Sequence, residues 1–353
     1  MHFTRRECLS AAAACAARTV EPLLGRLSGA RAIELPRWPL ATLAGAAMPI
    51  VPLKAQEWPS RPIRFLVGTA AGGSADVIAR SLSDLLAERL GQSLVVENNT
   101  QGAGAVAQLV VANSAPDGHT MLMMTAGYPP QMAMKKQPPF DPLDGFTYVV
   151  MVCGYPFVYA VAPDSPIKSF KDLLARATAA PRQLTYTINA FGSIYHVLTK
   201  WIEMEARVEL TPIPYRGSPA AFTDVTAGRV DIMVEPATTA FPRVKNGQLR
   251  VLALSSPERF PLMPEAPTVA ETLPGVEFMS WLGLAMAANT PRTIVDRVNK
   301  SVREILVLPE MQRRLVEAGS AATPSTPGEM RQKVATEFAR WQRVLAAAGI
   351  EQH

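Results

Sequence analysis

Apolar and polar residues follow a strand–helix–strand order from residue 63 onward. The run 63–67 is apolar enough for a buried strand, and the segment 74–91 repeats apolar residues every three or four positions, as an amphipathic helix does. Strands at 93–97 and 120–125 with a helix over 104–113 between them continue the series. This βαβαβ order predicts a parallel or mixed sheet covered by helices.

The same order returns after residue 163 and then gives way to helices. Strands are expected at 184–188, 210–215, 230–234 and 249–254, and helices over 169–177, 193–206 and 219–227. From Pro291 the periodicity is helical almost throughout, in units over 291–307, 309–318 and 327–348. The pattern therefore predicts two α/β units and a helical C-terminal part.

Length and composition agree with two domains of ordinary size. At 353 residues the chain is long for one domain, and its 48% apolar and 18% charged residues favour a large buried core over a disordered chain. No uninterrupted apolar run of about 18 residues, the length that spans a bilayer, occurs after residue 56.

The first 56 residues have the features of an export signal. Residues 4–9, Thr-Arg-Arg-Glu-Cys-Leu, resemble a twin-arginine signal. A second apolar stretch over 38–53 ends in a small-residue cleavage region near Ala55 and Gln56. The sequence leaves open which segment directs export, and a cytoplasmic protein with an Ala-rich tail is the alternative. We expect residues 1–56 to be a cleaved leader and the product to be periplasmic.

The net charge of +5 is concentrated in that leader. Residues 1–56 carry seven basic and three acidic residues, which leaves 28 basic and 27 acidic residues in the remainder. A nucleic-acid-binding protein keeps a basic face on its folded part. The balance therefore argues against nucleic acid as a partner.

The segment between the first strand and its helix is a candidate anion site. It runs through Gly68, Thr69, Ala70, Ala71, Gly72, Gly73 and Ser74 to Asp76 in the first helical turn. Such a loop offers backbone N–H groups to a phosphate or a carboxylate, and the helix dipole adds positive potential. Its spacing fits neither a P-loop nor the dinucleotide-binding fingerprint, and a simple tight turn is the alternative. Asp76 either stabilises the helix or contacts a ligand amine or hydroxyl.

A second loop of this kind precedes another predicted helix. It consists of Asn189, Ala190, Phe191, Gly192 and Ser193. Two such loops in two α/β units could face each other across a cleft and hold an anion from both sides.

Residues for catalysis or metal binding are few. The internal histidines after the leader are His119, which we expect at the surface, and His196, and neither has a partner at metal-ligand spacing. Ser193 and His196 lie three positions apart, but the G-x-S-x-G elbow of many hydrolases is missing. Cys153 lies in an apolar strand over 147–153 and is expected to be a small buried side chain. We expect no cofactor, no metal site and no catalytic residue.

A series of short motifs in order along the chain points to one family. They are Trp58 to Arg64, Gly72 to Asp76, Ala115 to Thr120, Phe140 to Pro142, Pro214 to Gly217, Gly228 to Asp231 and Pro264 to Glu271. Together they resemble the substrate-binding proteins of tripartite tricarboxylate transporters, the Bug-type (TctC-like) periplasmic receptors. The resemblance covers essentially all of residues 57–350.

That resemblance implies a two-lobed α/β fold of the Venus-flytrap type, with lobe 1 formed by 57–160 and 281–353 and lobe 2 by 161–280. It implies a receptor that binds a small carboxylate without catalysis and passes it to the membrane subunits of a transporter. The implied ligand contacts are Gly68 to Ser74, Asp76, Asn189 to Ser193, His196, Tyr215, Gly217 and Glu235.

The sequence departs from the family's pattern in places that bear on the ligand. Thr69 stands where an aromatic side chain is frequent, and Glu235 where Asp is common. Phe191 and Tyr195 occupy a region usually rich in Ser and Gly. If either ring faces the cleft, apolar burial favours a larger, partly aromatic acid over citrate. Packing of both rings against lobe 2 is the alternative.

Two other functions stay open at this point. A ligand-sensing module for a signalling partner would have the same two-lobed form, although the leader does not supply the helix-turn-helix of a LysR-type regulator. A hydrolase would use Ser193, His196 or Cys153. We expect a monomer, and the identity of the ligand is not fixed by the sequence.

Overall fold

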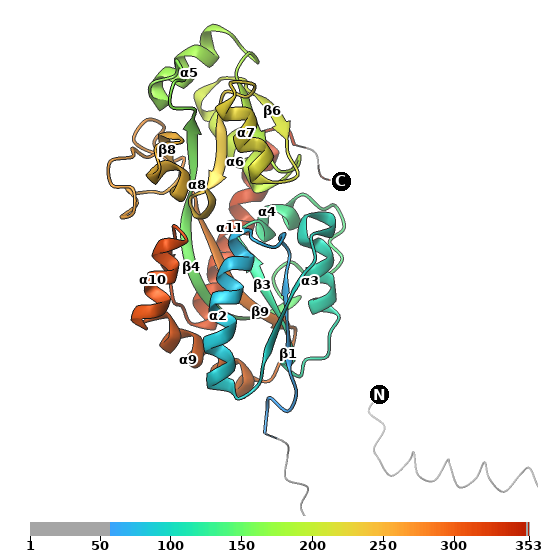
Figure 1. Cartoon of the computed structure of the whole chain (residues 1–353). Helices are drawn as coiled ribbons and strands as arrows, with labels where there is room; N and C mark the ends of the chain where they lie inside the picture. Colours follow the sequence, from blue (N-terminus) through green and yellow to red (C-terminus); the bar gives the residue numbers. More distant parts are fainter. Residues whose placement is uncertain (1–56, 351, 353) are drawn as a thin grey trace, which may run out of the picture. The chain divides into compact units, whose positions relative to one another are not determined.

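The computed structural model describes residues 57–350 and residue 352, which form an α/β structure with two lobes (Figure 1). Two long strands, β4 (Phe146–Val161) and β9 (Met279–Ala287), run through the region where the lobes meet. The expected fold class is confirmed. The predicted leader, residues 1–56, lies outside the residues that the structure describes.

Lobe 1 contains a mixed sheet with three parallel strands. β1 (Ile63–Val67) lies between β2 (Leu94–Asn98) and β3 (Thr120–Thr125), and β3 pairs antiparallel with β9. The short strand β10 (Ala321–Ala322) pairs with β4. The helices of this lobe are α2 (Ser74–Leu90), the 3₁₀ turn η1 (Gln101–Gly104), α3 (Ala105–Ala112), α4 (Tyr128–Ala133), α9 (Arg292–Leu306) and α10 (Pro309–Glu317).

Lobe 2 repeats the arrangement on a smaller scale. β5 (Thr185–Ile188) pairs parallel with β6 (Thr211–Pro214), while β7 (Met233–Pro236) and β8 (Arg250–Leu254) pair antiparallel with β4. Its helices are α5 (Phe170–Ala179), α6 (Ile194–Ala206), α7 (Ser218–Thr226) and α8 (Ala237–Lys245). In each lobe the parallel strands end at one edge of the sheet, so the loops that follow them gather there.

Strand β4 belongs to both lobes because its two halves pair with different strands. Its first part, 146–156, pairs with β9, whereas Val158 pairs with Glu235 of β7 and with Leu254 of β8. The strand is buried on both faces, which explains its continuous apolar sequence. Cys153 is fully buried and burial raises the pKa of its thiol to about 12, so the prediction of a small buried side chain is confirmed.

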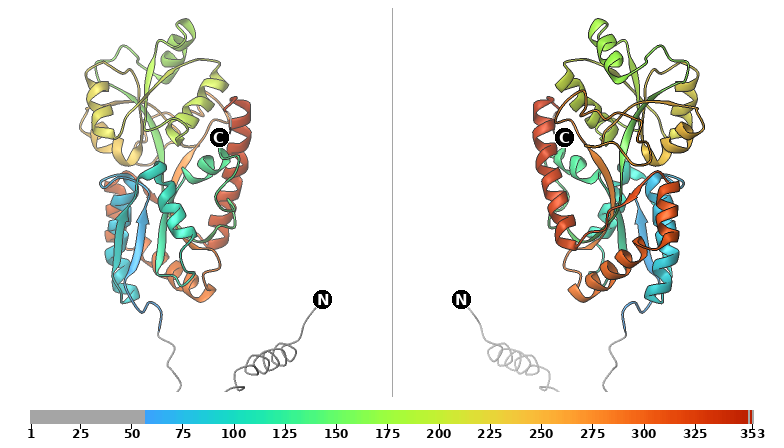
Figure 2. Two further views of the ribbon diagram at one scale, coloured as in Figure 1. Left: turned by 90° about the vertical axis from the view of Figure 1, so that its right-hand side faces the viewer. Right: turned by 90° about the vertical axis from the view of Figure 1, so that its left-hand side faces the viewer.

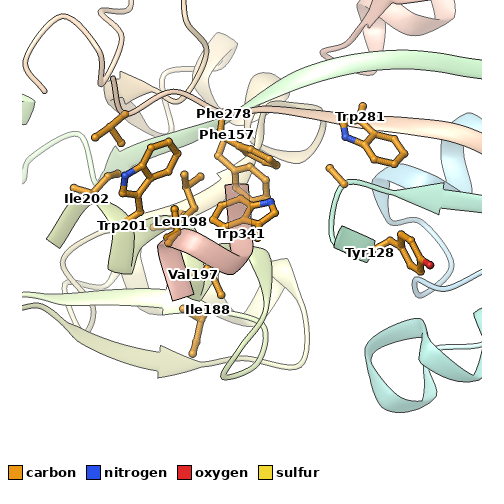
Figure 3. Close-up of a cluster of buried hydrophobic side chains, with 14 of the residues drawn as sticks. Tyr128, Phe157, Ile188, Val197, Leu198, Trp201, Ile202, Phe278, Trp281 and Trp341 are labelled. Carbon is orange, nitrogen blue, oxygen red and sulfur yellow. The ribbon is translucent and has the colours of Figure 1, made fainter. Parts of the chain in front are cut away.

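The C-terminal helix α11 (Pro327–Ala347) lies along both lobes (Figure 2). Trp341 of this helix is fully buried, with its ring centroid 6.1 Å from that of Trp201 in α6 and 5.5 Å from that of Phe278 (Figure 3). One turn earlier, Glu337 accepts a hydrogen bond from Nε1 of Trp281. The predicted boundaries place α11 in lobe 1, but the helix packs on elements of both lobes. The assignment of residues to lobes therefore stays a prediction.

Some elements differ from those expected. The strand expected at 230–234 begins later, at Met233, although Ile232 already forms an isolated parallel bridge with Tyr186 of β5. The carboxylate of Asp231 accepts hydrogen bonds from the backbone N and the hydroxyl of Thr185 (2.8 and 2.7 Å). The expectation that His119 is a surface residue is wrong, since it is 5% exposed and its Nε2 accepts a hydrogen bond from the backbone N of Ser60. Within the described residues, no helix has the length and apolar character needed to cross a bilayer.

Candidate ligand-binding site

The loop between β1 and α2, which we call loop 1 (residues 68–73), is shaped by its own backbone. Gly73 N donates to Ala70 O (3.0 Å), and Gly72 N donates to Oδ2 of Asp76 (2.9 Å). Gly72 has a φ of +77°, which glycine adopts without strain. The chain then enters α2 at Ser74, so the first N–H groups of a 17-residue helix, which have no partner inside it, lie at the end of loop 1.

The start of loop 1 is fixed by close packing. A Cβ on Gly68 would lie 2.9 Å from Cα of Gly104, so only glycine lets the two backbones approach this closely. Thr69 O accepts a hydrogen bond from Nδ2 of Asn98 (3.0 Å), whereas the Thr69 hydroxyl is buried without a partner among the described residues. Ala70 and Ala71 follow as exposed residues.

The carboxylate of Asp76 stabilises loop 1 through hydrogen bonds. It is 3% exposed, and besides Gly72 N its carboxylate accepts hydrogen bonds from Nε of Arg80 (3.0 Å) and Nδ2 of Asn98 (2.9 Å). Burial alone would raise the pKa of Asp76, but these hydrogen bonds outweigh it and hold the pKa below its usual value. Of its two predicted roles, the geometry favours stabilisation of the loop and helix over contact with a ligand.

The loop between β5 and α6, which we call loop 2 (residues 189–193), has the same geometry as loop 1. Ser193 N donates to Ala190 O (3.2 Å), as Gly73 N does to Ala70 O. Gly192 has a φ of +76°, against +77° for Gly72. The residues that precede the two helices also match, with φ and ψ of −71° and 166° at Ser193 and −75° and 165° at Gly73. The two lobes therefore present equivalent loops.

His196 has in loop 2 the role that Asp76 has in loop 1. Gly192 N donates to Nδ1 of His196 (3.1 Å), so this nitrogen carries no proton. Burial, with the positive charge of Lys200, lowers the pKa of His196 and favours the neutral ring that the contact requires.

Contacts across the lobes show that the two loops face the opposite lobe. The Ser74 hydroxyl forms a hydrogen bond with the hydroxyl of Thr238, in the first turn of α8. In loop 2, a Cβ on Gly192 would lie 3.1 Å from Sδ of Met134, at the end of α4. Thr238 and Met134 were not predicted from the sequence, because only the packing of the lobes brings them to the loops.

A cavity of about 320 Å³ lies where loop 1 approaches lobe 2. Its lining combines Gly72 and Ser74, two further residues of α2, the start of α8 and the end of α10. Of the predicted ligand contacts only Gly72 and Ser74 line it. A larger cavity of about 480 Å³, at the ends of α6 and α11, contains none of them.

Glu235 lies at the end of β7, beneath the start of α8. It is 5% exposed and accepts a hydrogen bond from the hydroxyl of Thr239 (2.7 Å). Burial raises the pKa of Glu235, against the opposing effects of the Thr239 and Ser218 hydroxyls and the charge of Arg243. The predicted contact Glu235 is thus a carboxyl group biased toward its neutral form, with three polar neighbours that the sequence did not identify.

Tyr215 and Gly217 lie in the loop between β6 and α7. The Tyr215 hydroxyl donates to Oδ2 of Asp224 (2.6 Å), and burial together with this hydrogen bond raises the pKa of Tyr215 to about 12. Its hydroxyl is therefore engaged within lobe 2. Gly217 is exposed and immediately precedes Ser218, the first residue of α7.

The two aromatic residues of the second loop region have different surroundings. The Tyr195 ring packs edge-on against Phe157, with centroids 4.9 Å apart. Burial, then the nearby Glu235 and Tyr155, raise the pKa of Tyr195 well above its usual value. Phe191 is 65% exposed, and its ring lies edge-on to that of His196, with 5.5 Å between the centroids. The Tyr195 ring thus lies against β4, the strand that both lobes share, and both alternatives for these two rings stay predictions.

The residues suggested for a hydrolase do not form a catalytic pair. The Ser193 hydroxyl donates to Ala190 O (2.6 Å), while Nδ1 of His196 is occupied by Gly192 N. In the part of the chain that the structure describes, no three His, Cys, Asp or Glu residues are grouped so that they could hold a metal ion.

Comparison of the sequence with known families gives one match that covers most of the chain. Residues 78–350 match the model of the tripartite tricarboxylate transporter family receptor. A protein from the tcbD–tcbE intergenic region of Pseudomonas sp. strain P51 is 32% identical over 82% of this chain and 86% of its own length. BugT of Bordetella pertussis is 31% identical over 87% of this chain and 94% of its own.

Solved structures agree with the sequence match. The R. palustris protein Rpa4515, solved with adipate, has a TM-score of 0.77 and 32% identity, over 83% of this chain and 99% of its own. The periplasmic binding protein BugD has a TM-score of 0.76 and 28% identity, over 84% and 100%. MatC of Rhodopseudomonas palustris, solved with malate, has a TM-score of 0.75 and 27% identity, over 82% and 100%.

Proposed function

Because this chain belongs to the tripartite tricarboxylate transporter family of receptors, we propose that it is a periplasmic receptor that binds a small carboxylate between its two lobes. The relatives solved with adipate and with malate support a carboxylic acid as the ligand.

The pair of equivalent loops carries this proposal. Loop 1 and loop 2 each end at a helix N-terminus, where N–H groups without intrahelical partners are available to a carboxylate. Neutral backbone donors hold an anion without leaving an unpaired cation buried in the empty site. The ligand-binding residues in this proposal are therefore the backbone of 68–74 and 189–194, rather than the side chain of Asp76.

Closure follows from the position of the loops on opposite lobes. A ligand that contacts both loops binds the closed arrangement more tightly than the open one, and it shifts the population toward closure by that difference in affinity. The hydroxyl contact between Ser74 and Thr238 adds a direct link between the lobes in the closed arrangement.

The remaining parts of the proposal concern the setting of the receptor. It would reach the periplasm by cleavage of residues 1–56, act as a monomer, and deliver its ligand to membrane subunits of the transporter without catalysing a reaction. The hydrogen bonds of Ser193 and His196 to their own loop support the absence of catalysis.

The replacement Ser74→Pro tests the role of the backbone donors. Proline is tolerated at the first position of a helix, and Gly73 already has the extended conformation that a residue before proline needs. The variant lacks the N–H group of residue 74, and Ser74→Ala, which lacks only the hydroxyl, is the control. Binding is measured as the thermal shift of the purified protein against mono-, di- and tricarboxylates and aromatic acids.

We expect at least one acid to stabilise the wild-type protein, by about 2.7 kcal/mol at one hundred times the dissociation constant. Ser74→Ala should keep most of this shift, and Ser74→Pro should lose most of it. A wild-type protein that responds to no acid contradicts the proposed ligand class. Equal binding by the two variants contradicts the role of loop 1.

A further inference from the structure

The side chain of Asn98, the last residue of β2, connects the start of loop 1 with helix α2. Its Nδ2 donates to Thr69 O of loop 1 (3.0 Å) and to Oδ1 of Asp76 (2.9 Å). Its Oδ1 accepts a hydrogen bond from Nη2 of Arg80 (3.0 Å). The amide thus uses both its N–H groups and its oxygen, although the residue is exposed. Asn98 therefore ties loop 1 and the first two turns of α2 to the neighbouring strand.

The place of Asn98 beside loop 1 follows from the register of the sheet. Val67, the residue before loop 1, pairs with Asn98. In lobe 2, Ile188, the residue before loop 2, pairs with Pro214 in the same parallel arrangement. The side chain of proline has no hydrogen-bonding group, so Pro214 cannot hold loop 2 in the way that Asn98 holds loop 1.

Loop 2 contains a side chain that restrains it from within, whereas loop 1 has glycine at the same place. The Ser193 hydroxyl donates to Ala190 O (2.6 Å). Gly73, which has the same backbone conformation at the start of α2, offers no hydroxyl. Loop 1 is also one residue longer than loop 2 between its strand and its helix, and ordering a longer segment costs more conformational entropy. Loop 1 therefore depends more on a restraint from outside.

We propose that Asn98 is a positioning residue, which holds loop 1 in its ligand-binding conformation before the ligand arrives. The inference rests on the proposed function, in which the backbone of loop 1 binds a carboxylate. In this role Asn98 acts through Thr69 and Asp76 and does not contact the ligand. A loop that is ordered in advance spares the ligand the cost of ordering it, and the apparent affinity falls with the fraction of molecules whose loop is ordered.

Two variants remove the donor. Asn98→Ala deletes the whole amide, while Asn98→Asp keeps the shape of the side chain and an oxygen acceptor but cannot donate to Thr69 O. The control Asn113→Ala removes a comparable hydrogen bond from another exposed asparagine, from its Nδ2 to Leu109 O (2.9 Å) at the end of α3. Amide hydrogen exchange is measured by NMR on the ligand-free proteins. Dissociation constants are measured by calorimetry for the acids that stabilise the wild-type protein.

The N–H groups of Gly72 and Gly73 report on loop 1, because both donate within the loop and its helix. Those of Gly192 and Ser193 form the equivalent hydrogen bonds in loop 2 and serve as the internal reference. We expect both Asn98 variants to accelerate exchange in loop 1 about tenfold, the effect of one or two hydrogen bonds, and to leave loop 2 unchanged.

The same variants should weaken binding of every acid by about tenfold without changing the order of preference among acids, because the backbone donors themselves are intact. The control variant should change neither the exchange rates nor the affinities.

Failure of the inference is distinguishable from failure of the proposed function. If acids bind and the Asn98 variants keep wild-type affinity, the positioning role is refuted and the receptor function stands. Weaker binding with unchanged exchange in loop 1 also refutes it, and so does equal acceleration in both loops, which would mean that Asn98 stabilises the fold as a whole. If the wild-type protein binds no acid, the proposed function fails, whereas exchange in loop 1 still decides whether Asn98 orders this loop.

Discussion

At the scale of single residues, each loop of the proposed site is held by one side chain that accepts a hydrogen bond from the loop backbone. Asp76 does so as a carboxylate held ionised by Arg80, and His196 does so as a neutral imidazole. A carboxylate with a lowered pKa stays an acceptor over the whole physiological range, whereas protonation of the imidazole would turn Nδ1 into a donor facing Gly192 N–H. Loop 2 is therefore the acid-sensitive one.

We predict that ligand affinity is constant above about pH 6.5 and falls as the pH drops through the lowered pKa of His196. Stability should follow the same direction. Because the folded-state pKa lies below that of the unfolded chain, the unfolded chain takes up the proton first, and the free energy of unfolding declines as the pH falls below about 6.5. Lys200 is the neighbouring charge that contributes to this shift.

The measurement is a series of dissociation constants between pH 5 and pH 8, for the wild-type protein and for His196→Asn. Asparagine supplies an amide oxygen as an acceptor that does not titrate. Titration of the ligand's own carboxylates affects both proteins alike. If their affinities change in parallel over the whole range, His196 is not the titrating group.

Individual residues also mark the limit of what the sequence could predict. The loops could be identified because Gly72, Gly73 and Gly192 are local signals between a strand and a helix. Arg243 could not, because its proximity to Ser218 depends on how α7 packs beside α8, which no local spacing encodes. The same holds for Thr238, whose contact lies in the other lobe.

At the scale of elements, the left-handed glycine of loop 2 combines two demands. Gly192 needs a positive φ, and it also leaves room for Met134 of α4. Gly228, after α7, has a φ of +69°, but a Cβ at this position would have no atom within 4 Å, so it meets only the first demand. Substitutions at Gly192 and Gly228 therefore distinguish the effect of backbone strain, which both positions share, from the effect of a close neighbour, which only Gly192 has.

We predict that Gly192→Ala and Gly228→Ala each lower the free energy of unfolding by about 1–2 kcal/mol, the strain of a left-handed alanine. Only Gly192→Ala should also weaken ligand binding, because its methyl group would lie 3.1 Å from Sδ and Cε of Met134, so that the Met134 side chain or loop 2 has to shift. Chemical denaturation gives the first quantity and calorimetry the second. Equal affinities of the two variants would show that the shape of loop 2 does not matter for binding.

Regular elements with local signals were predicted closely, and those without them were missed. The helix from Ser74 and the strand 120–125 were identified because periodicity and flanking residues define them. β9 was not, since it pairs with strands more than a hundred residues away in sequence and is apolar on both faces. α8 carries Pro242 in its interior, a residue that usually interrupts a helix.

At the scale of the whole molecule, the links between the lobes include the shared strands, helix α11 and the hydroxyl contact between Ser74 and Thr238. β4 and β9 are continuous through the junction, so we expect the proposed closure to bend these two strands. The contact between Ser74 and Thr238 lies at the loops and is available only when the lobes are close. It should therefore stabilise the closed arrangement without touching the strands.

We predict that Thr238→Val weakens ligand binding about fivefold, the effect of losing one hydrogen bond worth about 1 kcal/mol. X-ray scattering should show that this variant needs more ligand than the wild type to reach its compact radius of gyration. Thr223→Val, which removes an exposed hydroxyl of α7, is the control. Identical titrations of Thr238→Val and wild type would contradict a role of this contact in closure.

The indole pair formed by Trp201 and Trp341 has a practical consequence. One ring belongs to α6 of lobe 2 and the other to α11, which also packs on lobe 1, and they meet edge to face at 6.1 Å. Indole emission responds to the polarity and packing around the ring, so a change in how the lobes meet alters the surroundings of natural fluorophores. The intrinsic fluorescence of the unlabelled protein thus offers a direct optical reporter of closure, suited to rapid mixing with ligand.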